Sequence, residues 1–397
     1  MHWLLLALGS MFVQQTLVTL GKVLPTVLAP AIVEEMKIDP SLLGVYVGIM
    51  AGTSLIVQAG CGSVIVRYGA LRVSQLALLL TAIGLGLAMP GLIPILVFSA
   101  IAIGTAASST PASSHLLGRY SSTKQAPLVF SVKQTAVPLG LLVAGLLGPI
   151  FTQLFGWRSA LFIIAFFCLL VAISLEFLRK EFDSDRDRNK KFHFSDFKGT
   201  IFLVLRTSGL KSLAIGCFAF VGLQATFVAY FVIYLTEIGY SLLDAGRIFS
   251  SAFAVAIIGR IFWGWASSGY INPRVILGSL ALAMYVSVSL TSLFNENWYD
   301  WQILLVAVFV TGTVFSWHGV VLAEAVRLAP NKMRGAVTGG VLAFGQCGGL
   351  VLPLVYSSLL KLTGSYQLGF LVCALPALFV GIVFVYSAFY QSKFRRT

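Results

Sequence analysis

The sequence predicts an all-α membrane protein with twelve transmembrane helices, arranged as two six-helix bundles related by pseudo-two-fold symmetry. Three observations lead to this fold class. The 397 residues are 58% hydrophobic and only 10% charged, with a mean hydropathy of +0.92, whereas soluble proteins carry roughly 25% charged residues. Apolar segments fall into six before and six after one polar interval. The second six repeat a spacing of small residues found in the first six.

Each apolar segment is about long enough to cross a hydrocarbon core, which takes roughly 20 residues of helix. Turn or charged residues bound the segments. The first one lacks the basic start and the cleavage pattern of a secretory signal, so we expect it to be retained as a helix. The predicted helices are residues 4–33, 42–66, 73–89, 93–117, 127–154, 159–177, 210–235, 242–266, 275–294, 301–326, 336–362 and 366–389.

The distribution of lysine and arginine predicts the orientation. Most basic residues outside the helices fall on the side of the two termini. Short cytoplasmic loops retain Lys and Arg, so we expect both termini to be cytoplasmic, in a bacterial inner (plasma) membrane. This topology accounts for the net charge of +13, so no nucleic-acid partner is expected. The expected partners are membrane lipid, a small anionic substrate and protons, and we expect a monomer.

Several classes of site are missing from the sequence. The five cysteines lie in apolar stretches without a CxxC pair, and no histidine stands at metal-ligand spacing. No phosphate-binding loop, nucleophile elbow or pair of catalytic carboxylates occurs. We therefore expect neither an enzyme nor a metal, a cofactor or ATP-driven transport.

One long polar interval, residues 179–209, lies almost midway along the chain. We predict that it is a cytoplasmic linker between an N-terminal bundle at residues 1–178 and a C-terminal bundle at residues 210–397. Two interpretations stay open. The interval is either a solvated loop with a short interfacial helix near anionic headgroups, or a regulatory docking site.

An internal repeat supports the division into halves. A shift of 202 positions aligns small residues and a loop signature, and close-packed helices use such small residues. The aligned pairs are Gly44 with Gly246, Gly48 with Ser250, Gly52 with Ala254, Gly62 with Gly264, Tyr68 with Tyr270, and Arg72 with Arg274. The fourth and tenth helices also end alike, at Arg119 and Arg327. These matches favour parallel halves related by an axis along the membrane normal.

The loop between the second and third helices, GSVIVRYGALR at residues 62–72, resembles the motif G-x-x-x-D-R-x-G-R-[KR] of the major facilitator superfamily. Gly62, Arg67 and Gly69 match it, and Val66 stands where the family usually has Asp. Together with the layout of six plus six helices, the resemblance implies the transporter fold of that superfamily. It also implies a coupling or gating role for Gly62, Arg67 and Gly69, with an altered charge relay.

Charged residues inside helices indicate a binding site, because burying one at the bilayer centre costs about 2.5 to 3.5 kcal/mol on insertion scales. Lys22 lies deep in the first helix and Arg260 in the eighth. Gln15, Thr19 and Lys22 share one helical face, and Gln224 corresponds to Lys22 at the offset of 202. We expect a midplane anion site to which both halves contribute. Alternatively, Lys22 reaches the headgroups or carbonyls freed by the nearby proline.

Further polar residues are candidates for the same site. Lys133 and Gln134 precede a Pro- and Gly-rich stretch of the fifth helix, although Lys133 could instead pair with Glu176 or reach headgroups. His318 is either a proton carrier or a packed hydrogen-bond donor. Gln346 gives the eleventh helix a polar face.

Glu324, three residues before Arg327, predicts a cytoplasmic gate or brace, with proton transfer as an alternative. The cationic interior predicts a secondary active transporter that moves a small organic anion, a carboxylate, by alternating access. Basic residues in helices one and eight are also similar to those of monocarboxylate-type members of the superfamily. Anion uptake against a negative-inside potential costs about 2.3 kcal/mol per 100 mV, so we expect proton symport. The alternatives are an exporter of drugs or amphiphiles and a membrane receptor that transports nothing.

Overall fold

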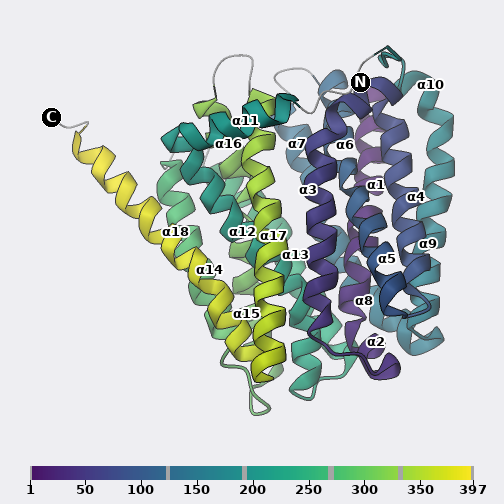
Figure 1. The fold of residues 1–397 in the computed structure, drawn as a ribbon, viewed down its shortest axis with the longest axis vertical. Coiled ribbons are helices and arrows are strands. Elements are labelled where there is room, and N and C mark those ends of the chain that lie inside the picture. The colour runs from purple at the N-terminus through teal and green to yellow at the C-terminus, as the bar shows by residue number, and fades with distance from the viewer. Residues whose placement is uncertain (1, 122–125, 190–194, 267–271, 330–333, 395–397) are drawn as a thin grey trace. The chain divides into compact units, whose positions relative to one another are not determined.

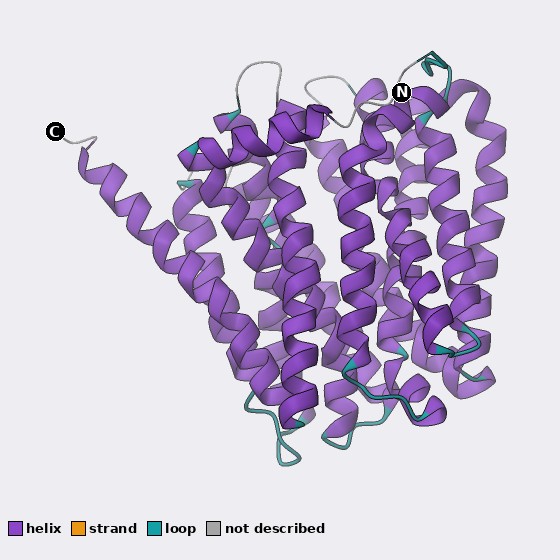
Figure 2. Ribbon diagram, in the orientation of Figure 1, coloured by secondary structure: helices purple, strands orange, loops and turns teal. Residues whose placement is uncertain are grey.

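The computed structural model describes residues 2–121, 126–189, 195–266, 272–329 and 334–394. Throughout these residues the chain forms helices joined by loops, and Figure 2 shows no strand among them. The predicted all-α class is confirmed. Tyr270, one of the aligned positions of the repeat, lies outside the described residues.

The helices follow one another with short connections (Figure 1). The earlier ones are α1 (His2–Val27), α2 (Ala29–Met36), α3 (Leu42–Tyr68), α4 (Ala70–Ala88), α5 (Ile93–Thr105), η1 (Ala106–Ser108), α6 (Ser109–Tyr120), α7 (Ala126–Gln134), α8 (Ala136–Phe155), α9 (Trp157–Ser174), η2 (Leu175–Leu178) and α10 (Arg179–Phe182). The later ones are α11 (Ser195–Arg206), α12 (Ser208–Glu237), α13 (Leu242–Ala266), α14 (Pro273–Thr291), α15 (Asp300–Val314), α16 (His318–Leu328), α17 (Arg334–Thr363) and α18 (Tyr366–Phe394).

Within the described residues, eleven helical spans are long and apolar enough to cross a membrane. The number rises to twelve when Leu42–Gln58 and Gly60–Tyr68, the two parts of α3, are taken as one span. Large apolar side chains project from these spans, for example Ile173 at 69% exposure and Phe379 at 63%. Such a surface suits lipid rather than water. The chain is a multi-pass membrane protein.

Proline explains two of the interruptions within spans. Pro111 has no N–H to donate to the carbonyl of Ala107, and η1 separates α5 from α6 at that point. Pro138 likewise leaves the carbonyl of Gln134 without its helical donor, and α7 ends at Gln134. The break between α15 and α16, at residues 315–317, has no proline in or after it within its span. Its cause must therefore be sought in tertiary contacts.

The contacts divide the chain into two compact units. The first comprises Met1–Pro40 and Ile49–Asp196, and the second comprises Ser41–Gly48 and Phe197–Thr397. The second unit thus includes the start of α3. The sequence-based division into residues 1–178, 179–209 and 210–397 ends the first bundle at residue 178, whereas the first compact unit extends to Asp196.

The two units pack their helices in the same pattern. In the first, α1 packs against α8 and α4 against α9; in the second, α12 packs against α17 and α14 against α18. A Cβ added to Gly140 of α8 would lie 2.7 Å from the carbonyl oxygen of Thr16, and Gly348 of α17 meets the carbonyl of Phe218 in the same way. Thr16 and Phe218 are 202 positions apart, the offset of the sequence repeat. Small residues therefore bring equivalent helix pairs together in each unit.

The first part of the polar interval, residues 179–187, is packed against the first unit, and we call it the strap. Phe182 and Asp183 within it are 0% and 3% exposed. The N–H of Asp187 donates to the carbonyl of Val66 at 2.9 Å. The expectation of a solvated loop is wrong for the strap, because its carboxylates and an aromatic ring find partners on the neighbouring helices.

Candidate functional site

The polar face predicted on the first helix is buried and bonded to α6. Gln15 and Thr19 are 4% and 8% exposed. The side-chain oxygen of Gln15 accepts from the hydroxyls of Ser109 at 3.4 Å and Thr110 at 3.2 Å. Its Nε2 donates to Thr19 Oγ1 at 3.4 Å. The structure therefore brings Gln15 and Thr19 together and adds two α6 hydroxyls that the sequence analysis missed.

Lys22 lies seven residues after Gln15 on the same face of α1. Its side chain is half-buried, and it has no hydrogen bond or ion pair with any residue that the structure describes. The adjacent Gly21 packs against Thr81 of α4, so Lys22 projects from a different face. The absence of a carbonyl partner in the described chain counts against the alternative in which Lys22 satisfies carbonyls near Pro25. An ammonium placed inside a span in this way is a functional candidate.

Lys133 is a second interior cation of the first unit. It is 0% exposed and lies next to Gln134, the half-buried last residue of α7. Full burial excludes the alternative in which Lys133 reaches headgroups. Glu176 accepts instead from Arg179 at 2.7 Å and from Arg72 at 3.3 Å. The alternative pairing of Lys133 with Glu176 is therefore not formed.

In the second unit, two predicted residues converge on the break in the tenth span. The carbonyls at the end of a helix have no intrahelical donor, and α15 ends at Val314. Gln224 of α12 donates from Nε2 to the carbonyl of Val314 at 2.9 Å. Arg260 of α13 donates from Nε to the carbonyl of Phe315 at 2.8 Å. These side chains replace the helical hydrogen bonds and stabilise the break.

His318 joins the same cluster, whereas Gln346 does not. The His318 ring, at the start of α16, stacks on Trp317 with centroids 3.8 Å apart, and Phe315, whose carbonyl accepts from Arg260, lies three residues before it. A proton on His318 would add a second positive charge beside Arg260, which argues against the proton-carrier alternative. Gln346 is half-buried and has no hydrogen bond within the described chain. Of the four residues predicted for the binding site on this unit, Gln224, Arg260 and His318 therefore lie at or beside the break.

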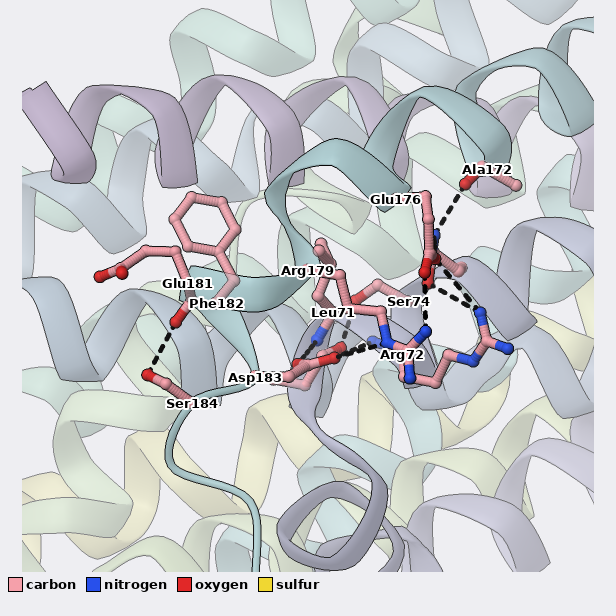
Figure 3. A network of polar contacts seen from close by, with 12 residues as sticks. Leu71, Arg72, Ser74, Ala172, Glu176, Arg179, Glu181, Phe182, Asp183 and Ser184 are labelled. Carbon is pink, nitrogen blue, oxygen red and sulfur yellow. Dashed lines mark hydrogen bonds and ion pairs between the residues drawn. The ribbon is translucent and has the colours of Figure 1, made fainter.

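The loop motif ends at a helix N-terminus that Asp183 of the strap caps (Figure 3). Asp183 Oδ1 accepts from the N–H of Leu71 at 2.8 Å, and Oδ2 accepts from the N–H of Arg72 at 3.1 Å. Burial raises the pKa of the Asp183 carboxyl, and the two backbone donors act in the opposite direction. Gly69 has φ +101°, and a Cβ there would overlap the Asp183 carboxyl. Glycine is thus required at this position both for its conformation and for space.

A second carboxylate of the strap binds α6. Asp185 accepts from Arg119 Nη1 at 2.9 Å and lies 3.0 Å from His115 Nε2. Arg119 also donates to the carbonyls of Glu181 and Phe182, each at 3.2 Å. The loop motif usually carries an Asp of its own, where this chain has Val66. In this chain the acidic side chains at this end of the first unit come from the strap instead.

The other two motif residues have different surroundings. Gly62 is exposed, and no heavy atom lies within 4 Å of a Cβ added there. The guanidinium of Arg67 lies over the ring of Tyr68, 5.6 Å from its centroid. Their coupling or gating role stays a prediction.

We expect Asp183→Ala to destabilise the protein by about 1 to 2 kcal/mol, because the buried N–H of Leu71 and the part-buried N–H of Arg72, at the start of α4, lose their acceptor. Thermal unfolding of the purified protein measures this loss, and tryptic cleavage after Lys180 should become faster. The matched control is Asp187→Ala, whose exposed side chain accepts, among the described residues, from the N–H of Asn189 alone. Equal stability of the two variants would show that the cap contributes nothing.

Glu324 and Arg327 form the predicted pair at the end of the tenth span. Glu324 is 1% exposed, and it accepts from Arg327 Nε and Nη2, both at 2.6 Å. Arg274 Nε of α14 lies 3.9 Å from the same carboxylate. This bidentate geometry is the strong form of an arginine–carboxylate contact, and it links α16 to α14. The pair fits a brace.

The structure adds residues that sequence reasoning missed. Ser109 and Thr110 lie in a serine-rich stretch of the fourth span, which could have been recognised as polar. Asp183 was hidden within a run of charges, because nothing local distinguishes it from its solvated neighbours. Ser316, at the break of the tenth span, carries no local signal at all.

Comparison with known proteins places this architecture. The family model described as "Major Facilitator Superfamily" matches residues 11–339. The "Nitrite extrusion protein" of Bacillus subtilis is 27% identical over 261 residues, which cover 62% of this chain and 60% of that protein. The "Probable nitrate/nitrite transporter NarK2" of Mycobacterium tuberculosis is 32% identical over 158 residues, 38% of each chain. The matches thus span three fifths or less of these relatives.

Solved structures share the fold at low identity. A POT family transporter in complex with 5-aminolevulinic acid has a TM-score of 0.74 at 15% identity, over 95% of both chains. A bacterial homolog to the human lysosomal transporter Spinster, in an inward-facing and occupied conformation, has a TM-score of 0.70 at 14% identity, over 96% of both chains. The fold and the family model agree with the resemblance of the loop motif. The chain belongs to the Major Facilitator Superfamily, a family of transporters rather than of enzymes.

Proposed function

We propose that this transporter moves a small planar oxyanion of the nitrite and nitrate class by alternating access, across a bacterial inner membrane and with both termini cytoplasmic. The observation that carries the proposal is the charge inside the spans. Lys22, Lys133 and Arg260 are basic residues of these spans, which also contain a few acids. Glu176 and Glu324, the deepest of these acids, are paired with arginines. The names of the two relatives support an anionic substrate.

The chemistry of the site fits a class of anions. Nitrite, nitrate and carboxylates each present two oxygens on one planar atom, and this geometry accepts two parallel hydrogen bonds from a guanidinium. The carboxylate predicted from the sequence belongs to the same class. The relatives favour its inorganic members.

Coupling follows from electrostatics. Anion uptake into a negative-inside cell costs about 2.3 kcal/mol per charge per 100 mV, so it needs a cotransported proton or an exchanged anion. Proton symport is our proposal. Export of nitrite would run down the potential and need neither. A cationic drug would be repelled by the positive charge of Lys22 in the first unit and by that of Arg260 in the second, which argues against the exporter of cationic drugs.

The test is flux into proteoliposomes. Nitrite or nitrate uptake should exceed that of empty vesicles and respond to an imposed pH gradient. Uptake of formate, lactate and tetraphenylphosphonium, measured in the same way, defines the limits of specificity. Lys22→Ala should lower anion flux roughly tenfold, because a charged hydrogen-bond donor is lost. Lys180→Ala, an exposed lysine of α10, is the control. Transport of tetraphenylphosphonium but of no anion would refute the proposal, and anion exchange without a response to pH would refute proton symport alone.

A further inference from the structure

At the break at residues 315–317, the two helix ends differ in whether their backbone polar groups have hydrogen-bond partners. Its carbonyl end is satisfied, because Val314 and Phe315 accept hydrogen bonds from Gln224 and Arg260. Its N–H end is not. The start of α16 has no side-chain cap, and the N–H groups of His318, Gly319 and Val320 have no acceptor among the residues that the structure describes.

Two buried side chains add further donors at the same place. Ser316 and Trp317 are 1% and 0% exposed. Ser316 Oγ and Trp317 Nε1 have no hydrogen-bond partner within the described chain. Ser316 Oγ lies 2.8 Å from the position that a Cβ added to Gly259 of α13 would occupy. Arg260 is the next residue of that helix. Ser316 therefore lies against the part of α13 that carries Arg260, and Trp317 is the next residue of the break.

Such an arrangement calls for an acceptor. A membrane interior offers no bulk water to an exposed N–H group, and a helix N-terminus attracts negative charge through its partial positive charge. Discontinuous helices in transporters place half-helix N-termini at anionic substrate groups. We propose that this break is an oxyanion subsite, in which Ser316 Oγ, Trp317 Nε1 and the first turn of α16 donate to the anion beside Arg260. The inference rests on the proposed function and assigns it a subsite within the second unit.

A buried water molecule is the rival occupant, because it could accept from the same donors. The two occupants differ in one measurable respect. If an anion is bound, removal of the donors weakens anion binding. If a structural water is bound, removal of the donors lowers the stability of the protein in the absence of anion.

The experiment measures the apparent Kd of nitrate and of nitrite for the purified full chain, from anion-dependent thermal stabilisation. Ser316→Ala should raise Kd about tenfold and leave the stability without anion unchanged or higher, because an unpaired donor is removed. Trp317→Phe, which keeps an aromatic ring but loses the N–H, should raise Kd similarly. The matched control is Ser287→Ala, a buried serine whose Oγ lies 3.2 Å from Thr313 Oγ1. It should lower stability and leave Kd unchanged.

The outcomes separate this subsite from the proposed function. If the wild-type chain binds the anion and Arg260→Ala weakens binding, but Ser316→Ala and Trp317→Phe keep the wild-type Kd, the subsite is overturned and the proposed function stands. A drop in anion-free stability for Ser316→Ala with unchanged Kd would identify a structural water and would also overturn the subsite. If neither nitrate nor nitrite stabilises the wild-type chain, both proposals fail.

Discussion

Replacement of Arg260 by alanine is expected to reduce anion transport by on the order of a hundredfold, since a charged donor and its hydrogen bond to the Phe315 carbonyl are lost together. The guanidinium donates from Nε to the carbonyl of Phe315 at 2.8 Å, and this bond fixes the plane of the fork. In Arg260→Ala, the Phe315 carbonyl inside the span loses this donor. The second unit also loses the cation beside His318. Arg260→Lys should not restore transport, because one ammonium cannot bond the carbonyl and present a planar fork.

The measurement is the initial rate of nitrite or nitrate flux in proteoliposomes, normalised to the amount of reconstituted protein. Arg247→Ala is the matched control, because Arg247 lies in the same helix but is exposed and pairs with Asp244 at 3.2 Å. Its flux should equal that of the wild type. Arg260→Ala with flux within threefold of wild type would remove Arg260 from the anion pathway.

The second large effect is expected from Gly348→Ala. An added Cβ would overlap the backbone carbonyl of Phe218, and no neighbouring side chain can rotate to make room. The helices α12 and α17 would have to separate, although they form a main contact of the second unit. Overpacking of this kind costs about 1 to 3 kcal/mol, which corresponds to a fall of roughly 5 °C in the midpoint of thermal unfolding.

Gly339→Ala makes the same change in the same helix where nothing lies within 4 Å of the added atom. It should be neutral or slightly stabilising, because alanine is the better helix former by about 1 kcal/mol. Opposite signs for the two variants, measured by thermal unfolding in detergent, would confirm that backbone contact and not helix propensity makes the glycine necessary. Similar midpoints for both would contradict this.

The sequence by itself determined the properties that depend on neighbours along the chain. Segment length and hydropathy predict the spans, because crossing a bilayer is a matter of summed local apolarity. The repeat at 202 positions predicts equivalent packing, and Thr16 and Phe218 indeed meet Gly140 and Gly348 in the same way.

Only the tertiary structure decided which polar groups meet across helices. The break of the tenth span has no proline, and it depends on donors from Gln224 and Arg260, 90 and 55 positions away along the chain. Asp183 looked like one of several solvated acids until its contacts with α4, more than 100 positions away, showed that it is a cap. Inside a membrane every backbone group needs a partner, but the sequence does not state which distant side chain will supply it. That choice is made when the helices pack.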